Sequence, residues 1–167
     1  MTRIRRILVP TDFSTTADAA LLRARDLAER LGASIHLLHV FEHPYTGGGF
    51  ATDGYIPIPE HVRDSARHSV ERLLAERMPP KERTFFGGTT EITYGTTARA
   101  IIDCAEAQSI DLIVMGTHGR TGLAHVLMGS VAEKVVRTAP CPVLTVREPQ
   151  RYAGEPLATP ATQLAFQ

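Results

Sequence analysis

Short runs of purely apolar residues alternate along this chain with segments whose apolar residues recur every three or four positions. Apolar runs of this kind predict strands buried on both faces, and the three-and-four spacing predicts amphipathic helices. Such alternation is typical of a parallel sheet between two helical layers. The expected strands fall at residues 7–10, 34–40, 91–94, 111–115 and 142–146.

The expected helices occupy the segments between these strands. Ser14 is placed to cap the first of them, and Gly32 follows its last apolar residue, where a left-handed residue ends a helix. With right-handed crossovers we expect a doubly wound, open, five-stranded α/β sheet with helices on both faces. We take its strand order to be 3-2-1-4-5, with the first strand in the middle. The expected helices cover residues 15–31, 60–77, 97–108 and 130–138, the second ending at Pro79-Pro80.

One domain accounts for most of the chain. The sequence has 167 residues and no visible internal repeat, and we expect residues 1–147 to form a single nucleotide-binding domain. Residues 148–167 are rich in Pro, Ala and Thr and are expected to form a flexible tail. Residues 43–59 contain three consecutive glycines and are expected to form a loop.

Charge and cysteine content argue against several classes of partner. The chain has 18 basic and 18 acidic residues, so no general attraction draws it to nucleic acid or to a membrane surface. The apolar run 7–9 is too short for a signal peptide, and no stretch approaches the length of a membrane span. Cys104 and Cys141 form no spaced framework and predict two buried thiols in a reducing compartment. We therefore expect a cytoplasmic protein.

A ligand site is expected where the winding of the sheet reverses, beyond the ends of the first and fourth strands. The loops there are residues 10–13 and 116–129. The second loop is neither a P-loop nor a dinucleotide fingerprint, but its glycines allow close approach of backbone amides and positive φ. Gly129-Ser130 opens a helix whose N–H groups and dipole favour an anion, and Arg120 can pair with phosphate.

Two of these residues also have a purely structural reading. Asp12 can accept hydrogen bonds from ribose hydroxyls or an adenine amino group, but an aspartate at this position is equally often a turn or cap residue. Ser130 and Glu133 match a capping box.

Seven histidines offer little evidence of a metal site. His36 and His39 are three apart on a strand, so they point to opposite faces and cannot chelate one ion together. His39 and His43 can approach near the expected site, although ordinary polar positions explain both better. His118 and His125 lie in the glycine segment, and His118 is read as an exposed loop residue. No metal-ligating set is expected.

The glycine segment and both ends of the chain's core resemble the universal stress protein family. Gly116-x2-Gly119-x9-Gly129-Ser130 is similar to the motif of its ATP-binding members. Ile7-Leu8-Val9-Pro10-Thr11-Asp12 resembles their first strand, and Cys141-Pro142-Val143-Leu144-Thr145-Val146 their last. The resemblance covers about residues 3–147.

The resemblance implies a set of nucleotide contacts. In the family the first loop and the end of the second strand hold adenosine, and the glycine motif holds ribose and phosphates. The family also commonly dimerises through its last strand, here Val143, Leu144, Thr145 and Val146, whose apolar edge would otherwise invite aggregation. The nucleotide contacts implied here are Pro10, Thr11, Asp12, Val40, Met115, Gly116, Gly119, Arg120, Gly129, Ser130 and Val131.

The leading hypothesis is a stress-response sensor or regulator whose dimer responds to ATP, with Mg²⁺ or Mn²⁺ on the phosphates. No nucleophile–base pair is recognisable in the sequence, so no catalytic residue is assigned and ATP turnover is expected to be slow at most. Three alternatives stay open: a nucleotide hydrolase or phosphotransferase using the same pocket, an interaction module that binds no nucleotide, and a protein specific for another adenine nucleotide such as AMP or a cyclic form.

Overall fold

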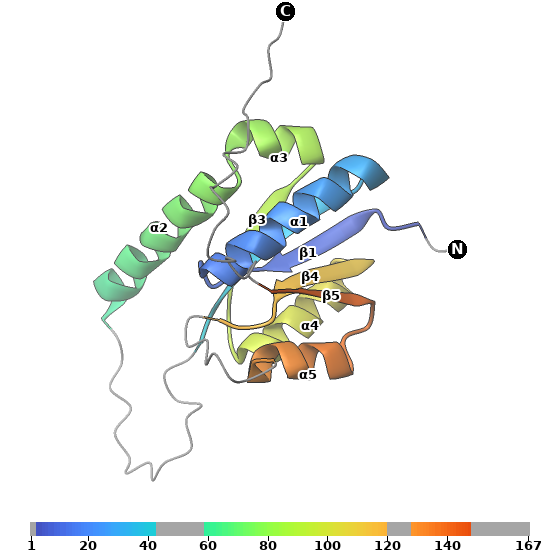
Figure 1. Ribbon diagram of the computed structural model, residues 1–167. Coiled ribbons are helices and arrows are strands. Elements are labelled where there is room, and N and C mark those ends of the chain that lie inside the picture. The colour runs from blue at the N-terminus through green and yellow to red at the C-terminus, as the bar shows by residue number, and fades with distance from the viewer. Residues whose placement is uncertain (1–2, 43–58, 120–127, 148–167) are drawn as a thin grey trace, which may run out of the picture.

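The computed structural model describes residues 3–42, 59–119 and 128–147 (Figure 1). Within them the chain forms five strands and five helices. The strands are β1 (Arg6–Pro10), β2 (Ser34–Phe41), β3 (Thr89–Tyr94), β4 (Leu112–Gly116) and β5 (Val143–Val146). The helices are α1 (Thr15–Leu31), α2 (Glu60–Arg77), α3 (Pro80–Phe86), α4 (Thr97–Ala107) and α5 (Ser130–Thr138).

All five strands join one parallel sheet in the order β3-β2-β1-β4-β5, which confirms the predicted fold class and strand order. β1 lies in the middle, where Leu8 pairs with His36 on one side and with Ile113 on the other. The side chains of Ile7, Leu8 and Val9 are completely buried, as expected for a strand covered on both faces.

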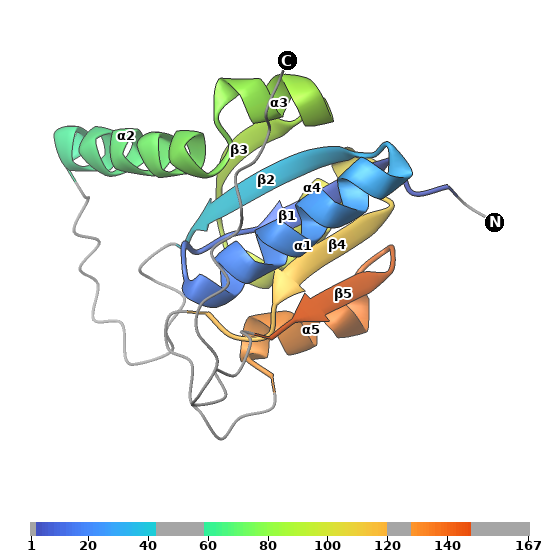
Figure 2. The ribbon, with the colours of Figure 1, turned by 45° about the horizontal axis from the view of Figure 1, so that its top comes forward.

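Helices cover the two faces of the sheet separately. On one face α1 and α2 pack through apolar residues such as Ala24 and Leu74 against Ile7 and Leu37. On the other face α4 and α5 pack against the opposite sides of the same strands. Figure 2 shows α1 on the near face and α4 and α5 on the far face. The face changes after β3, so the chain winds back past β1 toward β4 and β5.

The predicted signals at the two ends of α1 are confirmed. The Ser14 hydroxyl accepts a hydrogen bond from the Ala17 N–H at 3.2 Å, which satisfies one of the free donors of the first turn. Gly32 ends the helix with φ of +64°, a conformation that costs glycine little because it has no Cβ.

Two local predictions need correction. Pro79-Pro80 ends α2, but Pro80 is also the first residue of α3, because a proline at this position loses no helical hydrogen bond; β3 then begins at Thr89, two residues earlier than predicted. The capping box at Ser130 and Glu133 is absent. Gly129 is the N-cap of α5, and no side chain caps that end.

Some expectations lie outside the described residues. The tail at 148–167 and nearly all of the loop at 43–59 belong to these segments, as does His125. Both cysteines are free thiols, with Cys104 buried as predicted and Cys141 only partly buried. Among the described helices, none combines the length and the apolar content that crossing a membrane requires.

Ser14 and Ser130 form a matched pair for testing the two helix starts. Ser14→Ala is expected to lower the free energy of unfolding by about 1 kcal/mol, because the cap of α1 is lost. Ser130→Ala is expected to change it by less than about 0.5 kcal/mol, because this hydroxyl caps nothing. Urea unfolding without ligand measures both values, and equal losses for the two variants would contradict the assignment of the caps.

Candidate functional site

A cleft of about 660 Å³ opens beyond the carboxyl ends of β1, β2 and β4. Its volume is typical of pockets that hold small molecules. The first turn of α5 forms part of its wall, together with Thr97 and Ile101 of α4 and with Ser69 and Val70 of α2. The cleft therefore lies at the point where the winding of the sheet reverses, as predicted.

The structure brings almost all the predicted site residues to this cleft. Arg120 lies outside the described residues. The ten others line the cleft: Pro10, Thr11, Asp12, Val40, Met115, Gly116, Gly119, Gly129, Ser130 and Val131. His39, expected near the site, lines the cleft as well, and further lining residues that the sequence did not point to include Phe41, Glu42 and Thr97.

Asp12 shapes the loop after β1. Its Oδ1 accepts hydrogen bonds from the Ser14 N–H at 3.1 Å and from the Ser14 hydroxyl at 2.6 Å. The turn-forming role considered for Asp12 is thus present. Its other carboxylate oxygen faces the β4 loop, where a Cβ on Gly119 would come within 2.7 Å of it. Gly119 is therefore needed for the Asp12 carboxylate to occupy its place in the cleft.

The glycines of the motif allow close packing rather than unusual backbone angles. The predicted positive φ is wrong for Gly116, Gly119 and Gly129, none of which adopts it. A Cβ on Gly116 would lie 2.9 Å from Cγ2 of Thr16, so this glycine lets α1 approach β4. Gly129 donates its N–H to the carbonyl of Thr117 at 2.7 Å and so ties the start of α5 to the end of β4.

The amino end of α5 supplies backbone donors to the cleft. The helix begins at Ser130, and its first backbone bond runs from the Glu133 N–H to the Gly129 carbonyl at 2.9 Å. The N–H groups of Ser130, Val131 and Ala132 precede that bond and take no partner within the helix, and all three residues line the cleft. The positive end of the helix dipole adds to their attraction for an anion.

A buried histidine joins β2 to the loop after β1. His39 Nδ1 donates to the carbonyl of Thr11 at 2.8 Å. Its ring stacks on Phe13, with the ring centres 4.7 Å apart, and meets the edge of Phe41 at 5.1 Å. His36 lies on the opposite face of β2 near α4, as the spacing of the two histidines predicts. The sequence gives no signal for the contact between His39 and Thr11, because it joins residues 28 positions apart.

Phe13 has a strained backbone that Arg77 holds in place. Its φ of +66° is unfavourable for a residue with a Cβ. The Arg77 guanidinium lies 4.9 Å from the centre of the Phe13 ring and donates to the Phe13 carbonyl at 3.4 Å. Two further hydrogen bonds, of 2.6 and 3.1 Å, join Arg77 to the Asp18 carboxylate. The end of α2 therefore fixes the turn that presents Asp12.

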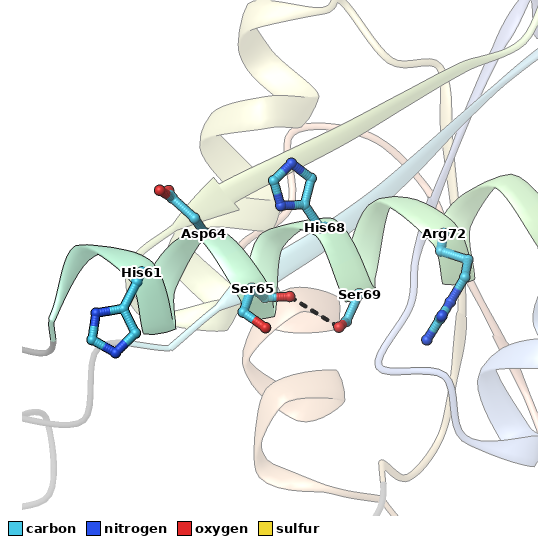
Figure 3. A pocket seen from close by; sticks show the side chains of 6 residues that line it. All are labelled: His61, Asp64, Ser65, His68, Ser69 and Arg72. Carbon is cyan, nitrogen blue, oxygen red and sulfur yellow. Dashed lines mark hydrogen bonds between the residues drawn. The ribbon is translucent and has the colours of Figure 1, made fainter.

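A second hollow lies on α2, and every residue that lines it belongs to this helix (Figure 3). The hydrogen bond drawn there runs from the Ser69 hydroxyl to the Ser65 carbonyl at 2.9 Å and is local to the helix. His61 and His68 are both exposed and point in different directions. No other described element lines this hollow, so it carries no functional assignment.

A parallel sheet wound in both directions from β1, with helices on both faces, places the chain in the doubly wound class of α/β proteins. The chain belongs to the universal stress protein family, whose model matches residues 3–147. It is similar to the universal stress protein MJ0531 of Methanocaldococcus jannaschii, with 33% identity over 149 residues, 88% of this chain and 84% of that protein.

Solved structures of relatives share the fold. The universal stress protein UspA of Lactobacillus plantarum is 30% identical, with a TM-score of 0.72, and the match covers 88% of this chain and all of that one. MJ0577 of Methanocaldococcus jannaschii is 28% identical, also with a TM-score of 0.72, over 89% of this chain and 99% of that one. Two structures that are 21% identical show the same fold, one a complex with cAMP and the other, from Archaeoglobus fulgidus, a complex with dAMP.

The contact between Arg77 and Asp18 is expected to stabilise the turn at Phe13 measurably. Because Asp18 is 44% exposed, we expect a coupling of only about 1 kcal/mol in a double-mutant cycle of Arg77→Met and Asp18→Asn. The exposed pair of Arg67 and Glu71, tested with Arg67→Met and Glu71→Gln, is the control and should give less than about 0.5 kcal/mol. Urea unfolding of each variant gives both couplings. A coupling near zero between Arg77 and Asp18 would show that Arg77 does not hold the turn.

Proposed function

We propose that this protein binds ATP, or another adenine nucleotide, in the cleft at the reversal point of the sheet and acts as a nucleotide-dependent regulator of the stress response. One observation carries the proposal. The N–H groups at the start of α5 that take no partner within the helix belong to residues that line the same cleft as Asp12, so the cleft offers donors for phosphate and an acceptor for ribose. Two proteins of this fold that hold cAMP and dAMP support an adenine nucleotide as the class of ligand.

The adenosine half of the ligand is assigned to the loop after β1 and the end of β2. Pro10, Thr11 and Val40 line this part of the cleft, and backbone groups there can pair with the adenine edge. Asp12 accepts from ribose hydroxyls through the oxygen near Gly119, while its Oδ1 stays bonded to Ser14. A fixed carboxylate loses little conformational entropy when it binds the sugar.

The phosphates are assigned to the other end of the cleft, at Gly129, Ser130 and Val131. Ser130 and Val131 carry N–H groups that take no partner within the helix, and all three residues lie at the positive dipole end of α5. Met115 and Gly116 complete the wall at the end of β4. Arg120 is assigned to the same phosphates by its place in the glycine segment. Mg²⁺ or Mn²⁺ would be held mainly by phosphate oxygens and water, as is usual for nucleotide-bound Mg²⁺.

We infer that any hydrolysis of ATP is slow. Fast hydrolysis needs a placed base and a metal-binding carboxylate beside the γ-phosphate. Asp12 is assigned to ribose, at the far end of the ligand from that phosphate. A ligand that is bound and held without turnover suits a regulator, because its binding energy then stabilises one state of the protein.

Thermal melting with and without ATP tests the proposal. At a hundredfold excess over Kd, ATP is expected to stabilise the fold by about 2.7 kcal/mol, a rise in Tm on the order of 5–10 °C. Gly119→Val is expected to abolish the rise, because its side chain displaces the Asp12 carboxylate. Calorimetric titration of the same two proteins with ATP checks that the loss is one of binding.

Gly32→Ala is the matched control. This glycine has φ of +64° far from the cleft, so the variant loses about 1 kcal/mol of stability but should keep the full rise with ATP. Saturating ATP that leaves the Tm of the unaltered protein unchanged would refute nucleotide binding. Phosphate release at about 1 s⁻¹ or faster would make the protein an enzyme rather than a regulator.

We also propose that two copies of the chain pair through β5. This strand is at the edge of the sheet and bonds only to β4 within the described chain. Leu144 on β5 is 40% exposed and Val136 on the adjoining α5 is 47% exposed. An open strand edge with exposed apolar side chains favours association with another strand, and an identical edge satisfies both copies by symmetry.

A charge on the β5 edge is expected to separate the proposed dimer. Leu144→Lys places a like charge on both copies at the shared edge and should yield a monomer in sedimentation velocity at micromolar concentration. Leu22→Lys changes an equally apolar residue, 57% exposed on α1, and should leave the dimer intact. A monomer for the unaltered chain under the same conditions would refute the pairing.

A further inference from the structure

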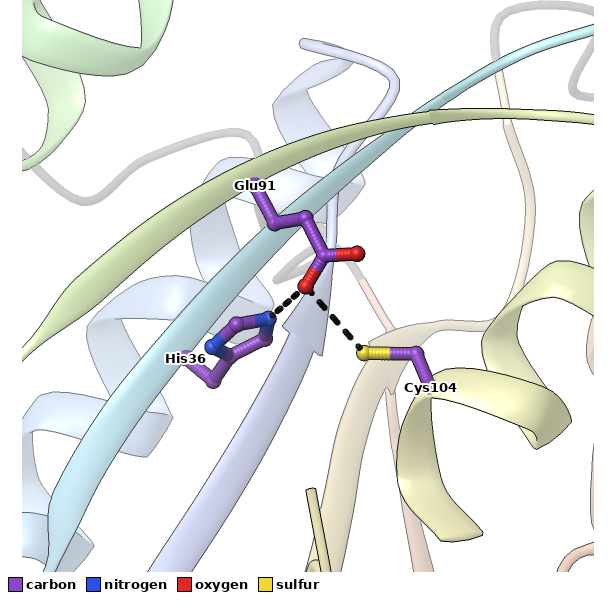
Figure 4. Close-up of side chains that lie close together, drawn as sticks. All are labelled: His36, Glu91 and Cys104. Carbon is purple, nitrogen blue, oxygen red and sulfur yellow. Dashed lines mark hydrogen bonds and ion pairs between the residues drawn. The ribbon is translucent and has the colours of Figure 1, made fainter. Parts of the chain in front are cut away.

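Three side chains from three elements converge on the face of the sheet covered by α4 (Figure 4). His36 comes from β2, Glu91 from β3 and Cys104 from α4. The Nε2 atom of His36 lies 2.9 Å from Oε2 of Glu91, and the Cys104 thiol points to the same oxygen at 3.9 Å. One ligand atom from each residue falls within 4.8 Å of the other two.

This cluster is separate from the nucleotide cleft. None of its three residues lines the cleft. His36 precedes Val40 by four positions on β2, and Cys104 follows Ile101 by one helical turn on α4. The two sites therefore share β2 and α4 but no ligand atom.

The donors of the cluster suit zinc. Imidazole nitrogen, thiolate sulfur and carboxylate oxygen are the ligands that Zn²⁺ takes in proteins. Bonds of about 2.0–2.3 Å place the ligands of a tetrahedral zinc ion about 3.5 Å from one another. The separations of 2.9 and 3.9 Å that share Oε2 of Glu91 lie on either side of this value. Small rotations of the side chains are enough to surround an ion.

The surroundings orient the histidine as a metal ligand requires. Thr89, next to His36 on β3, places its hydroxyl 2.6 Å from Nδ1 of His36. When Nδ1 donates its proton to this hydroxyl, Nε2 is left with a lone pair on the side of the ring that faces Glu91. A hydrogen bond of this kind fixes the ring and tautomer of metal-bound histidines in other proteins.

The three residues of the cluster differ in their exposure to solvent. The Cys104 residue is buried, the His36 side chain is 13% exposed and the Glu91 side chain is 37% exposed. Glu91 lies on β3, an edge strand, so an ion and a water molecule can enter past its carboxylate. Three protein ligands and one position open to solvent are the arrangement of exchangeable zinc sites rather than closed structural ones.

We propose that His36, Glu91 and Cys104 form a zinc-binding site, with water as the fourth ligand. On binding, the S–H bond of Cys104 breaks and its proton passes to solvent. The Nε2–H bond of His36, which donates to Glu91 in the absence of metal, also breaks and releases its proton, and Nδ1 takes up a proton so that the ring stays neutral. The hydrogen bond between His36 and Glu91 is thereby replaced by a bond from each residue to the ion. Neutral imidazole, carboxylate and thiolate together balance the two charges of Zn²⁺. Neither oxidant nor reductant is required.

Without a metal the same three residues form an ordinary polar contact. Burial and the charge of Glu91 raise the pKa of the Cys104 thiol to about 12, so the thiol is protonated at neutral pH. A hydrogen bond between His36 and Glu91 beside a buried thiol would then only join β2 to β3. The two interpretations differ in one measurable property, the formation of a metal–thiolate bond at Cys104.

Titration with Co²⁺ measures that bond directly. The protein, free of affinity tag and nucleotide, carries Cys141→Ser so that Cys104 is its one thiol. One equivalent of Co²⁺ is expected to produce the near-ultraviolet thiolate-to-cobalt band and the visible bands of a four-coordinate ion, and one equivalent of Zn²⁺ should remove them. In this background Cys104→Ser and Glu91→Gln are expected to abolish the thiolate band.

Two further variants, Thr89→Val and His68→Gln, test the hydroxyl beside His36 and provide a control. Thr89→Val removes the hydroxyl that orients His36 and should weaken Zn²⁺ binding about 10- to 100-fold while the fold, followed by circular dichroism, is kept. His68→Gln alters an exposed histidine on α2 and should leave the affinity unchanged. If Cys104→Ser fails to fold, Glu91→Gln and Thr89→Val decide the question, since Glu91 is partly exposed and Thr89 is exposed on the edge strand.

Two results would overturn the site. One is a folded protein that gives no thiolate band with Co²⁺. The other is a band, or a Zn²⁺ affinity, that survives both His36→Gln and Glu91→Gln, because the metal would then be bound adventitiously. Neither result involves a nucleotide, so each would refute the zinc site without bearing on nucleotide binding in the cleft.

Discussion

The parallel pairing of β1 with strands on both of its sides is the constraint on which the site depends. Its side chains at Ile7, Leu8 and Val9 are fully buried between two helical layers, so the strand cannot shift without exposing both cores. Because the chain leaves β1 toward β2 and returns at β4, the loops that follow β1 and β4 part at their carboxyl ends. The cleft is the space between them, and its position follows from the winding alone.

Packing between helices and strands determines which residues line the cleft as much as the needs of a ligand do. Gly116 is required by the contact of Thr16 with β4, and Gly119 by the place of the Asp12 carboxylate. The strained turn at Phe13 is held from outside by Arg77 at the end of α2. The glycine motif therefore meets two structural demands: the helices approach the sheet closely, and the amides at the start of α5 stay open to the cleft. Both bear on the proposed nucleotide, because the close packing at Gly119 also places the Asp12 carboxylate that is assigned to ribose.

Local signals predicted most of this fold because each acts within a few residues. The cap at Ser14, the turn at Gly32 and the spacing of apolar residues belong to this kind. The strand order, which no local signal encodes, was assumed with the first strand in the middle, and the structure has that order. α3 was missed because Pro79-Pro80 gives the same signal for a helix end and a helix start. The contacts of His39 with Thr11 and of Arg77 with Phe13 join residues 28 and 64 positions apart, and no local pattern encodes such pairs.

The histidines of β2 show what the alternation of side chains along a strand predicts and what it does not. Their spacing correctly separates His36 from His39, which excludes a shared metal ion. The spacing identifies no bonding partner for either histidine, because the partners are determined by the strand register and by the packing of the helices. The strand register pairs Thr89 with His36, and Glu91 lies two residues further along β3. The packing of α4 brings Cys104 to the same point. A site built from one residue each of two strands and a helix therefore leaves no motif in the sequence, even when all its donors suit one ion.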